Sequence, residues 1–225
     1  MGQNISVTAD NHQISGYLAL PTSGTGLPVI VVQEWWGLVP HIKAITDRLA
    51  QEGFVAFAPD LYHGVATTEP DQAKKLLMEL ELDGAGSDIV NAAKYLGQLP
   101  ESSSTSVSVM GFCMGGALAI WSATLSININ SVVGFYPGQS WERHKPDWTQ
   151  FNGKRALIHC SEADGTTQAP SIQEAFTKIV AANGTVELFD YPGTKHAFFN
   201  DDRPEVYDEQ ASRLSWDRTL KFLKG

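Results

Sequence analysis

The chain has 225 residues, of which 43% are hydrophobic, and a formal net charge of −9 at pH 7. This length allows one sizeable core, and the acidic excess argues against binding to nucleic acid or to an anionic membrane. The first residues lack the basic and then apolar pattern of a secretory signal, and no apolar run is long enough to cross a bilayer. We therefore expect one domain over residues 1–225, located in the cytoplasm as a monomer or weak homodimer.

Strand-like apolar runs alternate with helical patterns along the chain. In the first half, the predicted strands are 29–32, 54–58 and one from 107. The predicted helices there are 41–51, 71–82, 87–99 and one after 113. In the second half, the predicted strands are 131–136, 155–160 and 186–190, and the predicted helices are 171–182 and 205–223. Such alternation is typical of the α/β class, with a mainly parallel central sheet and helices on both faces.

The segment Gly-Phe-Cys-Met-Gly-Gly at 111–116 lies between a predicted strand and a predicted helix. Its glycines permit the sharp strand-to-helix turn on which a nucleophile is exposed above a sheet. At this position Cys113 would lie at a helix N-terminus, where unpaired N–H groups and the helix dipole favour the thiolate. The alternative is a structural cysteine buried in a glycine-rich turn. The flanking glycines favour the nucleophile.

Three further polar residues, Glu34, Asp164 and His196, follow predicted strands. Because the carboxyl ends of parallel strands meet at one edge of the sheet, their side chains are expected to lie near Cys113. The chain order of nucleophile, acid and base is that of α/β-hydrolases, in which the acid orients a histidine that activates the nucleophile. The sequence thus predicts a nucleophilic site built from these residues.

Two other carboxylates, Glu162 and Asp190, compete with Asp164 for the role of the acid. Glu162 lies nearer to its strand end, and Asp190 is expected still within its strand. An aspartate such as Asp164 also has a structural alternative, which is to accept a hydrogen bond from its own turn. His196 lies in a turn-rich loop just past a strand, where a structural histidine has little reason to be.

Together these motifs resemble the dienelactone hydrolase family, and the resemblance covers nearly the whole chain. It rests on residues 33–37, 58–62, 111–116, the turn at Asp164, and 191–198. It implies a single-domain α/β-hydrolase fold that hydrolyses cyclic enol-lactones and related esters. It also implies a thioester acyl-enzyme formed on Cys113, with His196 as base and Asp164 as its orienter.

The resemblance assigns roles to three more positions. It implies that Glu34 holds the neutral thiol in the resting enzyme and takes the thiol proton when substrate displaces it. Such a switch would confine reactivity to the loaded site, because a permanent thiolate invites oxidation. By the same resemblance, the backbone N–H groups of Met114 and Trp35 would form the oxyanion hole that acyl transfer requires.

The sequence departs from the family at the arginines that bind the substrate carboxylate in its best-known members. Asn200 stands near one of these places, with Arg203 further on, and no arginine occurs between residues 62 and 111. Aromatic residues around the pocket would favour a neutral or partly apolar ester or lactone. The predicted substrate-binding residues are Trp36, Tyr62, Phe198 and Asn200. The first alternative is therefore a broad-specificity carboxylesterase acting on neutral esters, without dienelactone activity.

The other histidines give weaker signals. His12, His41 and His144 are expected at the surface and His159 in the core, whereas His63 is ambiguous because it lies in a loop that substrate could touch. None of these histidines has metal-chelating spacing, and no nucleotide-binding glycine motif follows a strand, so we expect neither a metal nor a cofactor.

An alternative of another class is a non-catalytic module that binds a partner or senses oxidants through Cys113. A positioned base and its orienter argue against this alternative, because a sensor needs neither. A disulfide-based sensor would also need a resolving thiol, and Cys160, expected within a strand, is poorly placed for that role. We expect no disulfide between the two cysteines of the chain.

Overall fold

The structure is a computed structural model that describes residues 1–9, 12–138 and 140–225. The strands are β1 (Gln3–Ala9), β2 (His12–Ala19), β3 (Pro28–Val32), β4 (Val55–Pro59), β5 (Val107–Phe112), β6 (Ile129–Phe135), β7 (Arg155–Ser161) and β8 (Thr185–Tyr191). The α-helices are α1 (Pro40–Gln51), α2 (Pro70–Glu79), α3 (Leu82–Gln98), α4 (Met114–Ser122), α5 (Pro170–Ala181) and α6 (Glu209–Leu223).

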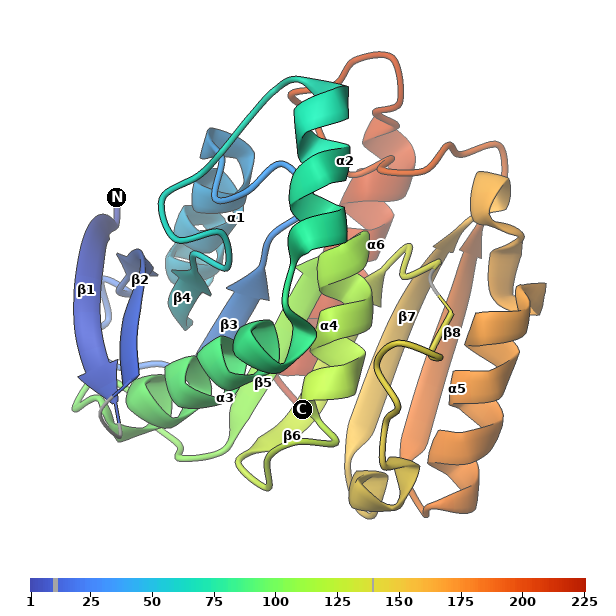
Figure 1. The fold of residues 1–225 in the computed structure, drawn as a ribbon. Helices are drawn as coiled ribbons and strands as arrows, with labels where there is room; N and C mark the ends of the chain where they lie inside the picture. The colour runs from blue at the N-terminus through green and yellow to red at the C-terminus, as the bar shows by residue number, and fades with distance from the viewer. Residues whose placement is uncertain (10–11, 139) are drawn as a thin grey trace.

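The described strands form one sheet in the order β1-β2-β4-β3-β5-β6-β7-β8 (Figure 1). Strands β1, β2 and β4 pair antiparallel, whereas the pairs from β4 through β3 to β8 are all parallel. The predicted mainly parallel sheet is therefore confirmed, and the carboxyl ends of its parallel strands lie along one edge. This edge carries the residues singled out in the sequence.

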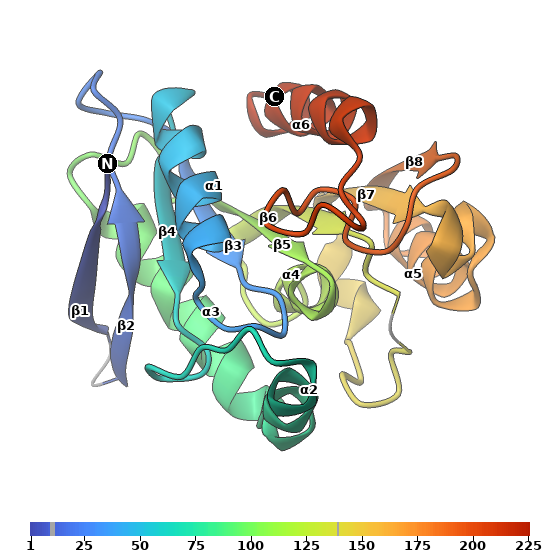
Figure 2. The same ribbon diagram turned by 90° about the horizontal axis from the view of Figure 1, so that it is seen from above.

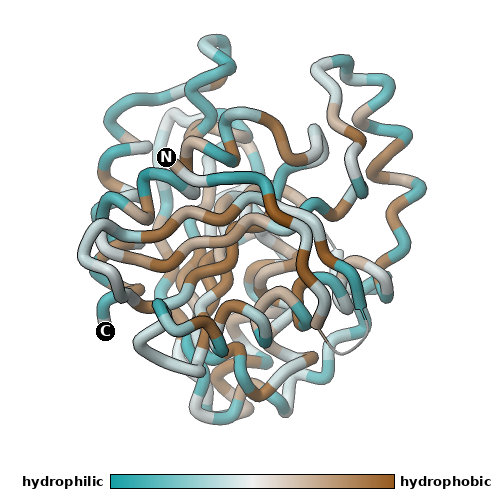
Figure 3. The backbone as a smooth tube through the Cα atoms, turned by 90° about the vertical axis from the view of Figure 1, so that its left-hand side faces the viewer, coloured by the Kyte–Doolittle hydropathy of each residue, from teal (hydrophilic) through white to brown (hydrophobic). Residues whose placement is uncertain are grey.

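Helices cover both faces of the sheet, as Figure 2 shows from above. Ile30 and Val32 of β3 pack into the core shared with α3, α4 and α5, while Val29 and Val31 pack into the core shared with α1 and α6. Successive side chains of a strand point to opposite faces, so a strand buried on both sides is apolar throughout. Figure 3 shows this as hydrophobic tube in the central strands, with more hydrophilic tube on the outer segments.

The N-terminal strands β1 and β2 were not among the predicted elements. In β1 the side chains alternate between exposed and half-buried, because this strand lies at the sheet edge and only one of its faces packs. A half-buried edge strand is less apolar than the central ones. Ile5 and Val7 alternate with polar residues and carry this weaker signal.

Helix bounds differ from the predictions by more than two residues at three places, the first being α2, which ends at Glu79 instead of at 82. Helix α3 begins at Leu82, five residues before the predicted start at 87, and α6 begins at Glu209 instead of at 205. The start of α6 is set by the Asp208 side chain, which accepts a 2.8 Å hydrogen bond from the backbone N–H of Ala211. A side chain at this N-cap position satisfies a helix N–H that has no partner within the helix.

Buried hydrogen bonds of His159 on β7 connect this strand to α6 and to β8. The two ring nitrogens of His159 lie 2.9 Å from Oγ1 of Thr219 and 2.8 Å from the hydroxyl of Tyr191. Burial lowers the pKa of His159 to about 3, helped by the positive charge of Arg218, so the imidazole is neutral and bridges the two hydroxyls. His159 is fully buried as predicted, and it fixes the strand ends that lead to Asp164 and His196.

Candidate active site

Cys113 lies on a strained turn between β5 and α4. Its φ of 56° and ψ of −120° place a non-glycine residue in the left-handed half of backbone space, and its side chain is half-exposed. A Cβ on Gly111 would lie 2.1 Å from the carbonyl oxygen of Gly115, and one on Gly115 would lie 2.3 Å from that of Gln33. Only glycine fits at both positions, which explains why the turn needs glycine on either side of the cysteine.

His196 and Asp164 form a hydrogen-bonded pair at the ends of β8 and β7. Nδ1 of His196 lies 2.8 Å from Oδ2 and 3.0 Å from Oδ1 of Asp164. The Ser161 hydroxyl donates a further hydrogen bond to Oδ2, so the carboxylate is held on both sides. Because Nδ1 is engaged by the carboxylate, Nε2 is the nitrogen left for Cys113.

The charges of this pair depend on each other. Burial alone would lower the pKa of His196, but hydrogen bonds to Asp164 and Cys113, together with the charges of both, raise it to about 10. Burial alone would raise the pKa of Asp164, but hydrogen bonds from His196 and Ser161 and the histidine charge lower it overall. Imidazolium and carboxylate therefore coexist at neutral pH, within hydrogen-bond reach of the thiol.

The two competing carboxylates have other partners. Oε2 of Glu162 accepts a 2.9 Å hydrogen bond from the backbone N–H of Gly193. This bond links the loop after β7, which carries Asp164, to the loop after β8, which carries His196 and is called the histidine loop below. Asp190 lies within β8, as predicted, and accepts a 2.6 Å hydrogen bond from the backbone N–H of Thr167. Of the three candidate acids, Asp164 is the one placed against His196.

Glu34 is buried at the end of β3, with 1% of its surface exposed. Its Oε2 accepts a 2.7 Å hydrogen bond from Nδ2 of Asn200, and its Oε1 accepts a 3.4 Å one from the Tyr136 hydroxyl. Among the residues that the structure describes, these are the hydrogen-bond donors to Glu34, and Cys113 is not one of them. The carboxylate and the thiol nevertheless line the same pocket.

Tyr136 is a site residue that the sequence analysis missed. It follows β6 directly, has a positive φ of 41°, and packs its ring at 5.1 Å from that of His196. Burial, and next the charge of Glu34, raise its pKa well above the usual 10, so the hydroxyl stays protonated and donates to Glu34. The strand-end position that singled out Glu34 and Cys113 was the available signal.

The pocket above Cys113 has a volume of about 220 Å³. Its lining residues are Glu34, Trp35, Trp36, Leu77, Cys113, His196, Ala197 and Arg203. Leu77 and Ala197 were not predicted. Met114, the other predicted oxyanion residue, is the first residue of α4, where a backbone N–H has no partner within the helix. Trp35 lines the pocket and Met114 follows Cys113 in the chain, and their role as an oxyanion hole stays a prediction.

Of the four predicted substrate-binding residues, Trp36 lines this pocket and the other three do not. Tyr62 is buried and donates a 3.5 Å hydrogen bond to Sδ of Met114. Phe198 is fully buried, because its ring packs against the rings of Tyr136 and Tyr191 beneath the histidine loop. Asn200 is 2% exposed and holds Glu34. These three buried side chains contact residues of the site or their neighbours and do not line the Cys113 pocket.

Arg203 is the one arginine in the described lining of the pocket, which holds no lysine. Its guanidinium is paired with Glu205: Nε and one terminal nitrogen lie 2.9 Å and 2.8 Å from Oε1 of that residue. The guanidinium also lies 5.5 Å from the centre of the Trp36 ring. Its charge is thus already balanced by a carboxylate. The lining is otherwise dominated by apolar and aromatic side chains around Glu34.

Two of the histidines expected at the surface are buried. His41 is 3% and His144 is 6% exposed, because His41 packs near the rings of Phe112 and Phe199 and His144 packs near two tryptophan rings. The segments around them look polar in sequence, but chain contacts from elsewhere cover both. His41 also lies 2.9 Å from a carboxylate oxygen of Asp201.

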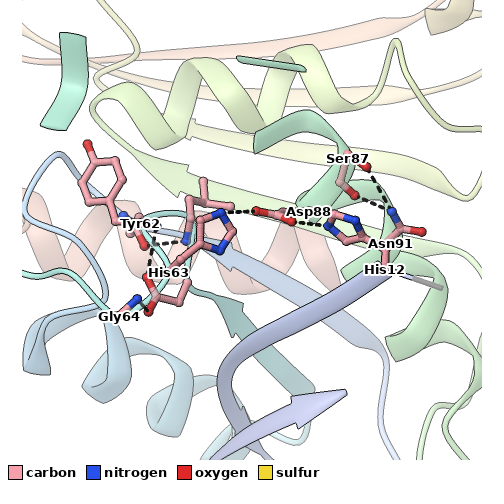
Figure 4. A network of polar contacts seen from close by, with 10 residues as sticks. His12, Tyr62, His63, Gly64, Ser87, Asp88 and Asn91 are labelled. Carbon is pink, nitrogen blue, oxygen red and sulfur yellow. Dashed lines mark hydrogen bonds and ion pairs between the residues drawn. The ribbon is translucent and has the colours of Figure 1, made fainter. Parts of the chain in front are cut away.

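His12 and His63 lie on either side of the buried Asp88 carboxylate (Figure 4). Nε2 of His12 lies 2.5 Å from Oδ1 of Asp88, and Nε2 of His63 lies 3.6 Å from Oδ2. The His63 side chain is 70% exposed and is not among the residues lining the Cys113 pocket. Within the described ranges, no group of three or more candidate ligands is arranged to hold a metal ion. No described helix is long and apolar enough to cross a membrane.

The parallel sheet, the strained Cys113 turn and the paired histidine and carboxylate at the strand ends define an α/β-hydrolase fold. The model of the dienelactone hydrolase family matches residues 14–225. The chain therefore belongs to the dienelactone hydrolase family, and it is a hydrolase acting on lactone or ester bonds.

Individual relatives agree with this assignment. Over its full length the chain is 32% identical to the protein usf of Aquifex pyrophilus, of which 98% is covered. It is 29% identical to carboxymethylenebutenolidase 1 of Cupriavidus pinatubonensis, over 94% of this chain and 91% of that one. The crystal structure of a dienelactone hydrolase-like promiscuous phosphotriesterase from metagenomic libraries superposes with a TM-score of 0.85 at 20% identity, covering 100% and 97% of the chains, and this likeness concerns the fold.

Proposed function

We propose that the protein hydrolyses an ester or lactone through a Cys113-His196-Asp164 triad and a thioester acyl-enzyme. The observation that carries this proposal is the 2.8 Å contact between Asp164 and Nδ1 of His196, which turns Nε2 toward a thiol on a strained strand-to-helix turn. Thiol, base and orienter in this arrangement are what nucleophilic acyl transfer requires. The proposal needs no metal or cofactor for either step.

In the acylation step, the thiol proton of Cys113 passes to the Glu34 carboxylate as Sγ attacks the carbonyl carbon, and the carbonyl oxygen becomes an oxyanion. In this proposal the backbone N–H groups of Met114 and Trp35 donate hydrogen bonds to that oxyanion. The carbon to oxygen bond then breaks, the leaving alkoxide takes a proton from Nε2 of His196, and the acyl group remains on sulfur as a thioester. In a lactone the alkoxide stays attached to the acyl group.

In the deacylation step, water replaces the alcohol beside His196. Nε2, now neutral, takes a proton from this water as its oxygen attacks the thioester carbon. The carbon to sulfur bond breaks, the carboxylic acid leaves, and the thiolate takes back the proton held by Glu34, which restores the thiol, the carboxylate and the imidazolium. Asp164 stabilises that imidazolium in both steps, which is why its pairing with Nδ1 supports the proposal.

For the substrate, the pocket favours a neutral ester or lactone. Arg203, the one arginine in the described lining, is paired with Glu205, and apart from Glu34 and the catalytic His196 the remaining lining is largely apolar. A substrate carboxylate would have to displace Glu205 to reach the guanidinium. This observation favours the second candidate, a broad-specificity carboxylesterase without dienelactone activity. Because the chemistry needs a free thiol, we also propose a reducing compartment, the cytoplasm.

Trapping the acyl-enzyme tests this proposal. The protein is mixed with 4-nitrophenyl acetate, quenched in acid within the first turnovers, digested and analysed by mass spectrometry. An acetyl group on the peptide containing Cys113, removable by neutral hydroxylamine and absent after incubation without ester, is the expected result. Acetylation found at a serine or lysine instead, with Cys113 unmodified during turnover, contradicts the thioester mechanism.

Substitution of Glu34 by glutamine is expected to lower kcat/KM by about 100-fold, because it removes the carboxylate that takes the thiol proton. The amide keeps the shape of the side chain and one acceptor oxygen for Asn200. Rates of 4-nitrophenyl acetate hydrolysis and of inactivation by hydrogen peroxide are measured for both proteins. Glu187→Gln, an exposed change on β8, is the matched control. If both rates stay at the wild-type values, Glu34 does not control the thiol.

A further inference from the structure

A second hollow of about 310 Å³ lies beside the Cys113 pocket. It is framed by the C-terminal part of α2, the start of α3, the first half of α4 and the loop after β6, which lie next to one another in both Figure 1 and Figure 2. Its lining residues are Leu77, Leu80, Leu82, Met114 and Leu118 on one side and residues 140, 142, 143 and 144 on the other. We call it the leucine pocket.

The leucine pocket adjoins the nucleophile. Leu77 lines both the leucine pocket and the Cys113 pocket, and Met114 follows the nucleophile directly in the chain. A group bonded to the sulfur therefore enters the leucine pocket by passing Leu77 and the Met114 side chain. The Tyr62 hydroxyl holds Sδ of Met114 at 3.5 Å, which fixes that side chain in the wall between the two spaces.

The size of the Cys113 pocket requires such an extension. Pockets for small molecules typically measure about 300–1,000 Å³. At about 220 Å³, the Cys113 pocket is below this range, so an ester larger than an acetate reaches into a neighbouring space. Two neighbouring spaces share lining residues with it: the leucine pocket, through Leu77, and a hollow of about 460 Å³, through Trp36 and Arg203.

The leucine pocket has the chemistry of an alkyl-chain site. Leu77, Leu80 and Leu82 are half-buried, and Met114 and Leu118 are each 1% exposed, so they present a continuous apolar wall. Opposite them, burial lowers the pKa of His144, so its imidazole is neutral at pH 7. The charged groups of Glu142 and Arg143 are in the exposed part of the lining. Polar head groups would lose hydration there, whereas methylene groups would gain from burial.

The position of His196 decides which half of the ester enters. The leaving alkoxide takes its proton from Nε2 of His196, so the alcohol half must face that residue. His196 lines the Cys113 pocket but is not among the described residues of the leucine pocket. The other neighbouring hollow shares Arg203 with the Cys113 pocket and carries the charged side chains of Asp202 and Glu205. The acyl half is thus the part that lies over Met114.

We propose that the leucine pocket is the acyl subsite, and that the substrates are esters or lactones whose acyl part carries an unbranched apolar chain. This inference rests on the proposed Cys113 mechanism and specifies its substrate class. The alcohol half contributes less to selectivity because it faces His196 and the charged side chains of Asp202 and Glu205.

The experiment compares two series of esters. In the first, the alcohol is constant and the acyl chain grows from 4-nitrophenyl acetate through butyrate and hexanoate to octanoate; in the second, the acyl group is acetyl and the alcohol grows from ethyl to hexyl. For the wild type, kcat/KM is expected to rise by about threefold per added methylene in the acyl series until the pocket is filled. It is expected to change little in the alcohol series.

Two substitutions change the pocket in opposite directions. Leu80→Trp fills it and is expected to abolish the gain with chain length while leaving acetate hydrolysis near the wild-type rate. Leu118→Ala enlarges it and is expected to move the optimum to a longer acyl chain. Leu214→Trp, an equal increase in volume at an exposed position of α6, is the matched control and is expected to keep the wild-type profile.

The outcomes separate this inference from the proposed function. Hydrolysis that depends on Cys113 but shows no preference among acyl chains, or a preference that follows the alcohol, overturns the acyl subsite and leaves the mechanism intact. Equal effects of Leu80→Trp on all esters of the acyl series also overturn it, provided that the variant unfolds at the wild-type temperature. Hydrolysis that survives Cys113→Ala overturns the proposed function, and the subsite with it.

Discussion

Replacement of Cys113 by alanine is expected to lower kcat/KM for ester hydrolysis by at least about 10³-fold, because it removes the atom that forms the acyl bond. The measurement is release of 4-nitrophenolate from 4-nitrophenyl butyrate by wild-type and variant protein at equal concentrations. The backbone at this position has a positive φ that alanine tolerates no worse than cysteine, so the variant is expected to fold. Its circular dichroism spectrum and melting temperature check that expectation.

The second cysteine of the chain supplies the control. Cys160 is 2% exposed within β7, and burial, followed by the charges of Asp190 and Asp164, raises its pKa to about 12. Its thiol is therefore protonated at neutral pH and is not a nucleophile. Cys160→Ala is expected to keep wild-type turnover, and iodoacetamide is expected to label Cys113 alone. Wild-type turnover by Cys113→Ala contradicts the assignment of the nucleophile.

The same pair of variants separates an enzyme from a thiol sensor. In a sensor, oxidation of Cys113 by peroxide would proceed but no ester in the panel would be hydrolysed in a Cys113-dependent way. The buried position of Cys160 also removes a partner for a disulfide-based sensor, because its side chain lies inside the sheet core. Turnover that depends on Cys113 therefore selects the hydrolase over the sensor.

The sequence predicts the catalytic edge of this protein better than it predicts the walls of the pocket. Glu34, Cys113, Asp164 and His196 were found because each follows a strand, and a parallel sheet brings strand ends together whatever the loops do. That topology alone leaves Glu162 and Asp190 as competitors for the acid, and the side-chain geometry pairs Asp164 with His196. Tyr136 obeys the same rule and was overlooked because an aromatic residue at a strand end looks like core.

The pocket walls depend on long-range packing that periodicity does not encode. Leu77 reaches the pocket because α2 lies over the start of α4, and nothing in the local pattern of α2 distinguishes Leu77 from Leu76, which lines a different hollow. Phe198 was assigned to substrate for its place beside His196, yet its ring is buried against Tyr136 and Tyr191. An aromatic side chain fits a pocket wall and a core equally well in sequence, and burial decides between them.

Substitution of Asp164 by asparagine is the second change with a large expected effect, a fall in kcat/KM of about 10²- to 10⁴-fold with little change in fold. The amide keeps the shape of the carboxylate but removes its charge and one of its acceptor oxygens. His196 then loses the group that holds Nδ1 and stabilises the imidazolium. The rate loss is measured with 4-nitrophenyl butyrate at neutral pH.

The pH dependence of kcat/KM tests the role of Asp164 more specifically than the rate loss alone. The wild-type His196 is protonated up to a pKa of about 10, and transfer of its proton to the leaving alkoxide requires that form. The rate is therefore expected to fall as the pH rises through about 10. Without the hydrogen bond and charge of the carboxylate, the pKa of His196 falls, and the alkaline limb of kcat/KM moves to lower pH.

Protein stability is expected to follow the same pair. Since the pKa of His196 is raised from 6.5 to about 10 on folding, its contribution to the free energy of unfolding is fully present below pH 6.5 and is lost as the pH rises toward about 10. The pKa of Asp164 is lowered from 3.8, so its contribution is present above pH 3.8 and is lost at more acidic pH. The stability difference between wild type and Asp164→Asn is thus largest between pH 3.8 and pH 6.5 and decreases as the pH rises toward about 10.

Glu162→Gln is the control for the acid assignment, because Glu162 lies two residues from Asp164 and accepts a hydrogen bond from Gly193 on the histidine loop. The glutamine oxygen is able to accept that same bond, so this variant is expected to keep both the wild-type rate and the wild-type alkaline limb. A rate loss in Glu162→Gln equal to that in Asp164→Asn, with the alkaline limb shifted in both, contradicts the assignment of Asp164. An unshifted limb in Asp164→Asn means instead that the thiol, and not the carboxylate, keeps His196 protonated.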